Sequence, residues 1–309
     1  MNKFIIIMSI LLIPQYCFGQ CCGAGNPISA LNGENTVKKQ NFRISLDYRH
    51  SESNSYYEGA NISDFDFPGK IKQSGYNYMS LGIAYGITSR LTVQTQLGYY
   101  INKYENYYSN LFSDFSISGL GDLALSLNYA VYRNIKKGIT INPYITVKFP
   151  IGKFNSEING VKVPISMQPS SGSYKYTAGT FITYSPINHL YIIANGFYEY
   201  SQRIKTNKFD YQYGNLTYIT LGGLYQVNKY FDLRTLLSYE IKTQSKSYNK
   251  PVYGSAYHKI KIIPSFTFWA IKDFSTTILV DIPIWRKMEA IQMGETWAIE
   301  IKLMYNIKL

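Results

Sequence analysis

Hydrophobic and polar residues alternate with a period of two along most of the chain, and the C-terminal segment has the clearest pattern. From Trp297 to Leu309 every second side chain is apolar, whereas Glu300 and Lys302 lie at the positions between. Because a β-strand points successive side chains to opposite faces, this segment predicts a strand with one apolar and one polar face. Its length of about thirteen residues exceeds the roughly 9–11 that a tilted membrane-spanning strand needs.

The same alternation recurs along the rest of the chain and predicts about twelve strands in all. Val93 and Leu97, for example, share one face of a segment whose other face carries Gln94 and Gln96. The predicted strands are 41–50, 76–87, 90–101, 117–132, 138–150, 173–185, 190–201, 214–227, 230–243, 255–271, 273–285 and 295–309. The segment 190–201 carries apolar residues on both faces, so the pattern alone does not assign its inner face.

The connections between these strands alternate between short and long. Short turns are expected near 88–89, 133–137, 186–189, 228–229 and 272–273, and long loops near 51–75, 102–116, 151–172, 202–213, 244–254 and 286–294. Short periplasmic turns and longer extracellular loops are typical of up-and-down outer-membrane barrels. With an even strand count, both ends of the chain lie on the short-turn, periplasmic side.

A soluble β-sandwich would also show alternation, but its strands average about 5–6 residues. The segments found here are about twice that length. Aromatic residues such as Tyr99, Tyr198 and Trp285 lie near the segment ends, where membrane barrels carry their interfacial girdles. An open sheet edge is not tolerated in hydrocarbon, so the first strand should pair with the last. The pattern therefore predicts an all-β fold: a single transmembrane, up-and-down, antiparallel β-barrel over 41–309, in the cell outer membrane.

The N-terminus reads as a secretory signal. Lys3 supplies the positive start, Phe4 to Pro14 form a short apolar core, and Gly19 is a small residue suited to cleavage. The core of about eleven residues is too short to span a bilayer as a helix. We expect cleavage after Gly19, so that 1–19 is a signal peptide and 20–40 a periplasmic tail.

The tail carries a cysteine pair, Cys21 and Cys22, because the third cysteine, Cys17, falls in the signal. The pair could form a vicinal disulfide, join another chain, carry a lipid or ligate a metal, and an oxidised, exposed tail is the preferred interpretation. Two thiols alone make an incomplete metal site, so we expect neither a metal nor a cofactor.

Composition and charge narrow the class of partner. The chain has 31 tyrosines in 309 residues, 16% charged residues and a formal net charge of +12. Its lysines and arginines are scattered rather than clustered in one run, which argues against nucleic-acid binding. A basic lumen, or contact with anionic lipid such as lipopolysaccharide, is the better interpretation.

If the polar faces point inward, charged and amide side chains line the lumen. The candidate lumen or solute-contact residues are Arg43, Asp47, Arg49, Asp122, Asn128, Lys148, Arg234, Glu240, Lys259, Lys261, Glu300 and Lys302. Eight-stranded barrels are filled by side chains and barrels of sixteen or more strands hold a channel, so about twelve strands lie between. A solute pathway with a mild preference for anions, a packed interior of paired charges, and loops folded inward as a plug therefore all remain open.

Two stretches point to a family. Gly119-Leu120-Gly121-Asp122 opens a strand, and the strand–turn–strand segment 81–91 precedes it. Over about 81–132 the chain resembles the outer-membrane transporter family named after the meta-pathway of phenol degradation. The resemblance implies passage of small, often hydrophobic, molecules through the outer membrane. Within the motif, Asp122 either pairs with a basic residue of the lumen or faces water, while the glycines permit strand curvature.

We therefore expect a non-enzymatic outer-membrane channel or transporter for small solutes, monomeric in the lipid bilayer. The apolar Leu309 resembles the C-terminal signal read by the outer-membrane insertion machinery, although a terminal aromatic is usual. One alternative is a structural or adhesive barrel that contacts partners through loop 51–75. A lipid hydrolase is the other, but His50, His189 and His258 lack a serine two residues later, and no zinc or phosphate-loop motif occurs.

Overall fold

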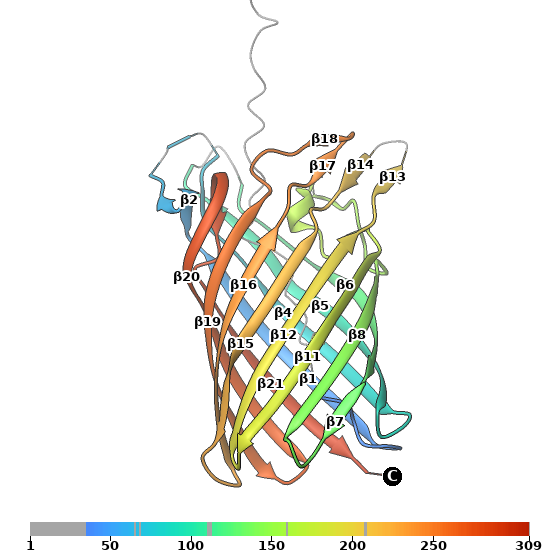
Figure 1. The fold of residues 1–309 in the computed structure, drawn as a ribbon. Coiled ribbons are helices and arrows are strands. Elements are labelled where there is room, and N and C mark those ends of the chain that lie inside the picture. Colours follow the sequence, from blue (N-terminus) through green and yellow to red (C-terminus); the bar gives the residue numbers. More distant parts are fainter. Residues whose placement is uncertain are drawn as a thin grey trace, which may run out of the picture.

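The computed structural model describes residues 35–64, 66–67, 69–109, 113–158, 160–206 and 209–308. Long antiparallel strands, tilted against the barrel axis, form a 12-stranded cylinder (Figure 1). The wall strands are β1 (Phe42–Ser53), β4 (Ile71–Gly86), β5 (Leu91–Tyr107), β6 (Phe115–Tyr129), β8 (Ile139–Phe149), β11 (Lys175–Ile187), β12 (Leu190–Ser201), β15 (Leu216–Gln226), β16 (Phe231–Lys242), β19 (Tyr257–Ile271), β20 (Phe274–Gly294) and β21 (Trp297–Ile307). The fold class predicted from alternation is confirmed.

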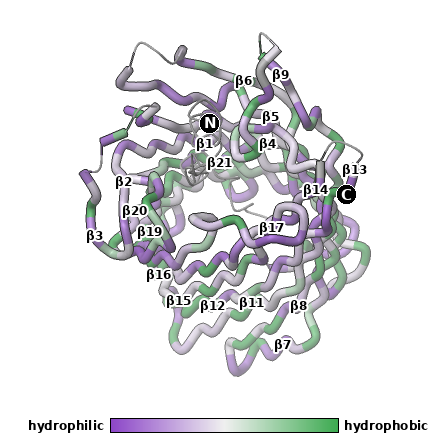
Figure 2. Tube along the Cα trace, turned by 90° about the horizontal axis from the view of Figure 1, so that it is seen from above, coloured by the Kyte–Doolittle hydropathy of each residue, from purple (hydrophilic) through white to green (hydrophobic). Residues whose placement is uncertain are grey.

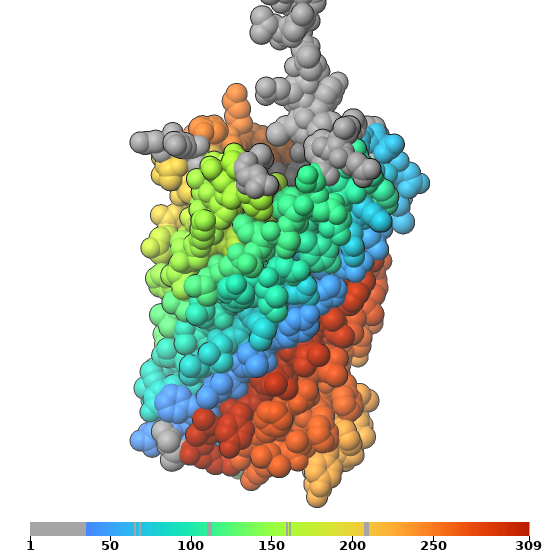
Figure 3. All heavy atoms as spheres, turned by 180° about the vertical axis from the view of Figure 1, so that it is seen from behind, coloured from blue at the N-terminus to red at the C-terminus, as the bar shows by residue number. Residues whose placement is uncertain are grey.

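The cylinder is closed by its first and last strands. β1 pairs with β21 from Phe42↔Ile307 to Glu52↔Trp297, and with β4 along its other edge. Figure 3 shows the two strands as adjoining blue and red bands across the back of the molecule. β19 likewise pairs with both β16 and β20, so the main wall of the described chain has no free edge. Closure of this kind gives the backbone N–H and C=O groups of the wall hydrogen-bond partners, which hydrocarbon cannot provide.

Each predicted strand matches a strand of the wall, and the largest differences are in three strands that extend well beyond their predicted ends. β4 begins at Ile71, β5 continues to Tyr107, and β20 continues to Gly294, so the predicted loop 286–294 is wrong. The upper part of β20 pairs with β19 as far as Met288 and then with β2 (Ser55–Gly59). These backbone partners come from distant parts of the chain, and the local sequence there does not alternate.

Short strands and a 3-10 helix lie at the two ends of the barrel. β7 (Tyr132–Asn134) lies at the turn end and pairs with β8. The loop end carries β3 (Asn61–Ile62), β9 (Glu157–Ile158), β10 (Val161–Lys162) and the 3-10 helix η2 (Ile165–Met167), together with a four-stranded sheet of β13 (Ile204–Thr206), β14 (Phe209–Gln212), β17 (Lys246–Ser247) and β18 (Lys250–Pro251). No helix in the described part of the chain is long and apolar enough to cross a bilayer.

The wall has an apolar outside and a largely polar inside. Leu46, Leu125 and Leu221 are exposed on the outer surface, whereas Ser45 and Asp47 on β1 are buried inside. The view along the barrel shows the strands alternating between hydrophobic and hydrophilic colours (Figure 2). Outward apolar side chains are what a lipid-facing wall requires, because they replace water-exposed surface by contact with hydrocarbon.

One part of the interior is apolar, which resolves the ambiguity of segment 190–201. On β12, Ile193 and Phe197 face inward and pack with Phe181, Tyr144 and Tyr218 from neighbouring strands. Both faces of β12 are therefore apolar for different reasons: one meets lipid and the other fills part of the barrel. The interior is thus partly packed by side chains.

Candidate functional site in the barrel interior

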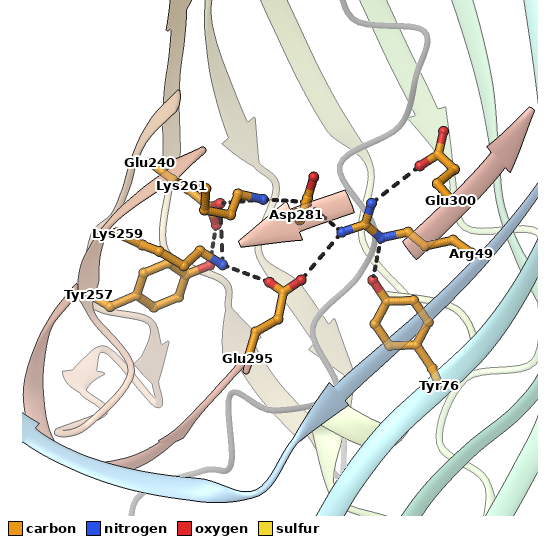
Figure 4. A network of polar contacts seen from close by, with 9 residues as sticks. All are labelled: Arg49, Tyr76, Glu240, Tyr257, Lys259, Lys261, Asp281, Glu295 and Glu300. Atoms are coloured by element: carbon orange, nitrogen blue, oxygen red, sulfur yellow. Dashed lines mark hydrogen bonds and ion pairs between the residues drawn. The ribbon is translucent and has the colours of Figure 1, made fainter. Parts of the chain in front are cut away.

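Arg49 of β1 is the centre of a polar network inside the barrel (Figure 4). Its Nη2 lies 2.7 Å from an oxygen of Asp281 and 3.3 Å from one of Glu295. Its Nη1 lies 3.2 Å from Glu300, and its Nε donates to the hydroxyl of Tyr76 at 3.0 Å. Every nitrogen of the guanidinium therefore has a partner, as a buried arginine requires.

Two lysines of β19 extend the network. Lys261 Nζ lies 2.8 Å from Asp281 and 3.9 Å from Glu240. Lys259 Nζ lies 3.0 Å from Glu295 and 3.4 Å from Glu240. These contacts join β1, β16, β19 and β20 to Glu295, which lies between β20 and β21.

The charges of this network are nearly balanced. Arg49, Lys259 and Lys261 face four carboxylates, and each of the three cations contacts at least two of them. Removing one member would leave a buried charge unpaired, at a cost of roughly 3–5 kcal/mol. The network is therefore a cross-link between strands, and its side chains are largely committed to one another.

A second charged cluster lies on the arc of wall formed by β8, β11 and β12. Lys148 Nζ lies 2.7 Å and Lys175 Nζ 3.8 Å from the carboxylate of Glu199, which also accepts from Thr177 Oγ1 at 3.3 Å. Lys175 also lies over the ring of Tyr213, 5.0 Å from its centroid. Two lysines share one carboxylate here, so this cluster has a positive balance.

Loop 150–174, between β8 and β11, folds into the barrel. Met167 and Ser170 are fully buried. Lys103 of β5 donates to the carbonyl oxygens of Ser166 at 3.0 Å and Gln168 at 3.1 Å, and its Nζ lies 4.4 Å from the centroid of the Tyr100 ring. A loop folded inward was one of the alternatives that the sequence left open for the lumen, without indicating which loop.

Asp122 anchors the same loop from β6. Its Oδ1 accepts from Ser170 Oγ at 2.6 Å and from the backbone N–H of Ser171 at 3.0 Å. The sequence suggested either a basic partner or a water-facing position, and the structure instead gives this carboxylate two loop donors. Two register shifts in the β5–β6 pairing lie beside these glycines, one next to Gly121 and one next to Gly119.

The described part of the N-terminal tail, residues 35–40, lies in the turn-end mouth of the barrel. Val37 is buried, and its N–H donates to Thr92 Oγ1 at 2.8 Å. Asn142 Nδ2 donates to Asn35 Oδ1 at 3.0 Å, and Gln40 N–H donates to the Gly86 carbonyl at 2.7 Å. The predicted signal peptide, the cysteine pair and Leu309 lie outside the described residues.

The predicted lumen residues all lie on the inner side of the wall. Asp47, Arg49, Asn128, Glu240, Lys259, Lys261 and Glu300 are buried there. Arg43, Lys148 and Arg234 are half-buried and contact inner-face partners, Arg234 through Ser265 at 3.0 Å, and Lys302 is the cross-strand neighbour of Asp47. Alternation was sufficient to find them because it assigns a face to each position.

The sequence did not identify Lys103, Tyr76, Arg286 or Glu295 as interior residues of interest. Lys103 and Arg286 were assigned to loops, because their strands were predicted to end before them. Glu295 reaches the network from the connection between two strands, where no periodicity applies. A period-2 count continued along β20 from the inward-facing Asp281 would have placed Arg286 on the outer face, since the β19–β20 register shifts between Lys261↔Pro283 and Ile260↔Trp285.

The histidines make no serine contact. His50 Nδ1 lies 2.9 Å from Asn77 Oδ1, and His258 Nδ1 lies 2.8 Å from the hydroxyl of Tyr239. Neither pair, among the described residues, includes the serine nucleophile that a lipid hydrolase would need. The described residues also contain no group of three or more His, Cys, Asp or Glu side chains arranged to hold a metal ion.

Solved structures share this fold. The chain is similar to the COG4313 outer membrane channel from Pseudomonas putida F1, with a TM-score of 0.70 and 13% identity over 88% of this chain and 97% of that one. Weaker likenesses are to a Pseudomonas aeruginosa FadL homologue (TM-score 0.49, 9% identity, 93% and 98% covered) and to the KdgM porin (0.45, 10%, 84% and 98%). No protein-family profile and no curated protein matches the sequence.

The likeness to the Pseudomonas putida channel shows the fold: this chain has the closed, 12-stranded antiparallel β-barrel architecture of outer-membrane barrels. The barrel fold agrees with the architecture that the resemblance to an outer-membrane transporter family implied. Membership of the family named after the meta-pathway stays a prediction.

Proposed function

We propose that this outer-membrane β-barrel is a channel for small solutes, which cross through its polar and net-basic interior. The observation that carries the proposal is the polar inner face, present on strands all around a cylinder wider than the eight-stranded barrels that side chains fill. A closed barrel that only anchored a loop surface would need no such lining, because buried polar groups cost free energy unless they are paired.

Unpaired hydroxyls support a wet interior. The Oγ atoms of Ser51, Ser74 and Ser275 are buried and have no hydrogen-bond partner among the described residues. Buried hydroxyl groups ordinarily have a partner, either protein or ordered water. Water inside the barrel would supply these partners, and a hydrated lumen is the first requirement of a solute pathway.

The net charge of +12 and the lysine-rich cluster around Glu199 favour a preference for anions. The Arg49 network weakens this preference for anions, since it contains more carboxylates than cations. We therefore expect only a mild selectivity. The likeness to an outer membrane channel supports transport, and we carry over from it neither a solute nor a mechanism.

Conductance of the purified protein in planar lipid bilayers tests the proposal. A channel gives discrete current steps whose size rises with KCl concentration. Under a KCl gradient, the sign of the reversal potential should show that chloride passes through the channel more readily than potassium. Absence of steps in preparations that contain folded protein would contradict the channel, and a potassium preference would contradict the net-basic lumen.

The second candidate is a structural or adhesive barrel without transport. It is favoured by the inward-folded loop 150–174 and by residues 35–40, which occupy the two ends of the interior. Proteoliposomes separate the two candidates, because a channel admits small sugars and swells whereas a plugged barrel does not. Release of fatty acid from phospholipid by the same preparation would instead revive the lipid-hydrolase alternative.

We also propose that the protein is a monomer, surrounded by phospholipid and lipopolysaccharide and inserted by the outer-membrane insertion machinery. The closed wall supports the monomer, because no strand edge of the main sheet is left for a second copy. Light scattering of the detergent-solubilised protein measures this, and a stable dimer mass would contradict it.

A further inference from the structure

Arg286 of β20 differs from the other cations around the Arg49 network. Its side chain is buried, with 6% of the residue exposed. Arg49, Lys259 and Lys261 each contact at least two carboxylates, whereas Arg286 makes neither an ion pair nor a hydrogen bond with any described residue. Its Nη1 is fully buried without a partner. A buried guanidinium without an acceptor is costly, so binding of an anionic group beside it would be favourable.

The position of Arg286 is at the loop end of the barrel interior. It is the cross-strand neighbour of Lys259, and both side chains lie on the same, inner face of the β19–β20 pair. This part of β20 extends beyond its pairing with β21, which ends at Asp281. A solute that enters from the loop end would therefore meet Arg286 before it reaches Arg49.

The surroundings of Arg286 hold the guanidinium in place without using its donors. Its Cζ lies 4.1 Å from the centroid of the Tyr57 ring. On Gly294, a Cβ would lie 2.5 Å from Nη1 and 3.0 Å from Tyr57 Cδ2, so the absence of a side chain there makes room for the guanidinium. Stacking on an aromatic ring orients a guanidinium and leaves its in-plane N–H groups available.

The carboxylates of the neighbouring network are already paired with other cations. Glu240 contacts Lys259 and Lys261, and Glu295 contacts Arg49 and Lys259. No described carboxylate lies within 4.0 Å of Arg286, and withdrawing one from the network would unpair a lysine or Arg49. An acceptor for Arg286 must therefore come from outside the chain.

We propose that Arg286, oriented by Tyr57 and Gly294 and flanked by Lys259, binds an oxyanion at the loop end of the barrel. The fork of a guanidinium matches two oxygens of a carboxylate or a phosphate. The inference rests on the proposed channel function and deepens it: the solute class is small molecules that carry a carboxylate or phosphate group.

Isothermal titration calorimetry of the whole mature protein in neutral detergent tests the site. Inorganic phosphate and acetate are the probes, titrated separately at low ionic strength. Arg286→Gln should weaken binding by about tenfold or more, because a hydrogen-bonded charge pair contributes about 1.5–3 kcal/mol. Lys287→Gln is the matched control: it removes the same charge from the next, exposed position and should leave binding unchanged.

The two probes distinguish the sources of the oxyanion. Binding of acetate points to a carboxylate solute and binding of phosphate alone to a phosphorylated one. If Arg286→Gln does not fold, Gly294→Ala serves instead, because it displaces the guanidinium without changing the charge and should also weaken binding. No binding of either probe to the wild type, or an equal loss in Lys287→Gln, would overturn the site.

Failure of the site and failure of the channel are separable. The calorimetric measurement needs no ion flow, so a protein that conducts but does not bind these probes contradicts only the oxyanion site. A protein that binds them through Arg286 but neither conducts nor admits solutes contradicts only the channel.

Discussion

Single glycines decide how the interior is filled. A Cβ on Gly98 of β5 would overlap the phenol ring of Tyr78, whose Cε2 lies 2.5 Å from that position. The ring of Tyr78 packs on Tyr100 at a centroid distance of 4.8 Å, and Tyr100 in turn lies beneath Lys103. Gly98 thus makes room for the aromatic group against which the inward-folded loop is held.

At this scale, Gly98→Ala should destabilise the barrel by about 1–3 kcal/mol, because an added methyl group overpacks a filled interior. The matched control is Gly196→Ala on β12, where the nearest atom to an added Cβ is 4.0 Å away. Its effect should stay within about 0.5 kcal/mol. Urea unfolding in lipid vesicles measures both, and equal midpoints for the two variants would contradict the role of Gly98.

Among the elements, loop 150–174 depends most on side chains that lie far from it in sequence. Lys103 and Asp122 belong to β5 and β6, and both bind backbone or serine groups of the loop. The loop also has a small apolar core, in which Met167 and Val163 pack with Phe115 and Ile117. Its inward position therefore combines charge-assisted hydrogen bonds with apolar burial.

Asp122→Ala should release part of this loop. Hydrogen bonds to a charged group contribute about 1.5–3 kcal/mol, so the open population should rise about tenfold or more. Trypsin should then cut faster after Lys153 and Lys162, while the barrel stays intact. Asp64→Ala, which alters an exposed carboxylate of another loop, should leave the cleavage rate unchanged. A rate for Asp122→Ala equal to the wild-type rate would show that the apolar core alone holds the loop.

Closure is the property of the whole molecule on which everything else depends. β21 is paired on both sides, since Ile301 lies opposite Tyr48 of β1 and Ile278 of β20. In a closed barrel no strand is an edge strand, so a position in regular pairing with both neighbours cannot lose its backbone N–H without a lost hydrogen bond in hydrocarbon.

Ile301→Pro should therefore impair assembly, because proline removes the N–H at a position where β21 is in regular pairing with both neighbouring strands. Ile301→Val keeps the apolar outward side chain and the N–H, and should assemble normally. The folded and unfolded forms differ in electrophoretic mobility before and after boiling, which gives the readout. A heat-modifiable, folded band for Ile301→Pro at wild-type yield would contradict closure through β21.

Features that depend on local sequence could be predicted, whereas features that depend on contacts between distant segments could not. Period-2 alternation located the twelve wall strands and the inner-face residues, because each strand must by itself present an apolar face long enough to cross the bilayer. It did not find the upper part of β20, where the pairing partner is β2, or the role of Lys103. Those features depend on contacts between segments that are distant in sequence.

The amino-acid sequence alone thus determined the fold class, the strand count and the face of the charged residues within the predicted strands, since the membrane imposes these demands locally on every strand. The tertiary structure alone decided which charges meet. Closure and register bring Glu295 and Glu240 to Lys259, and they leave the neighbouring Arg286 without a carboxylate. Pairing across a barrel depends on the stagger of all its strands, and no single segment encodes that stagger.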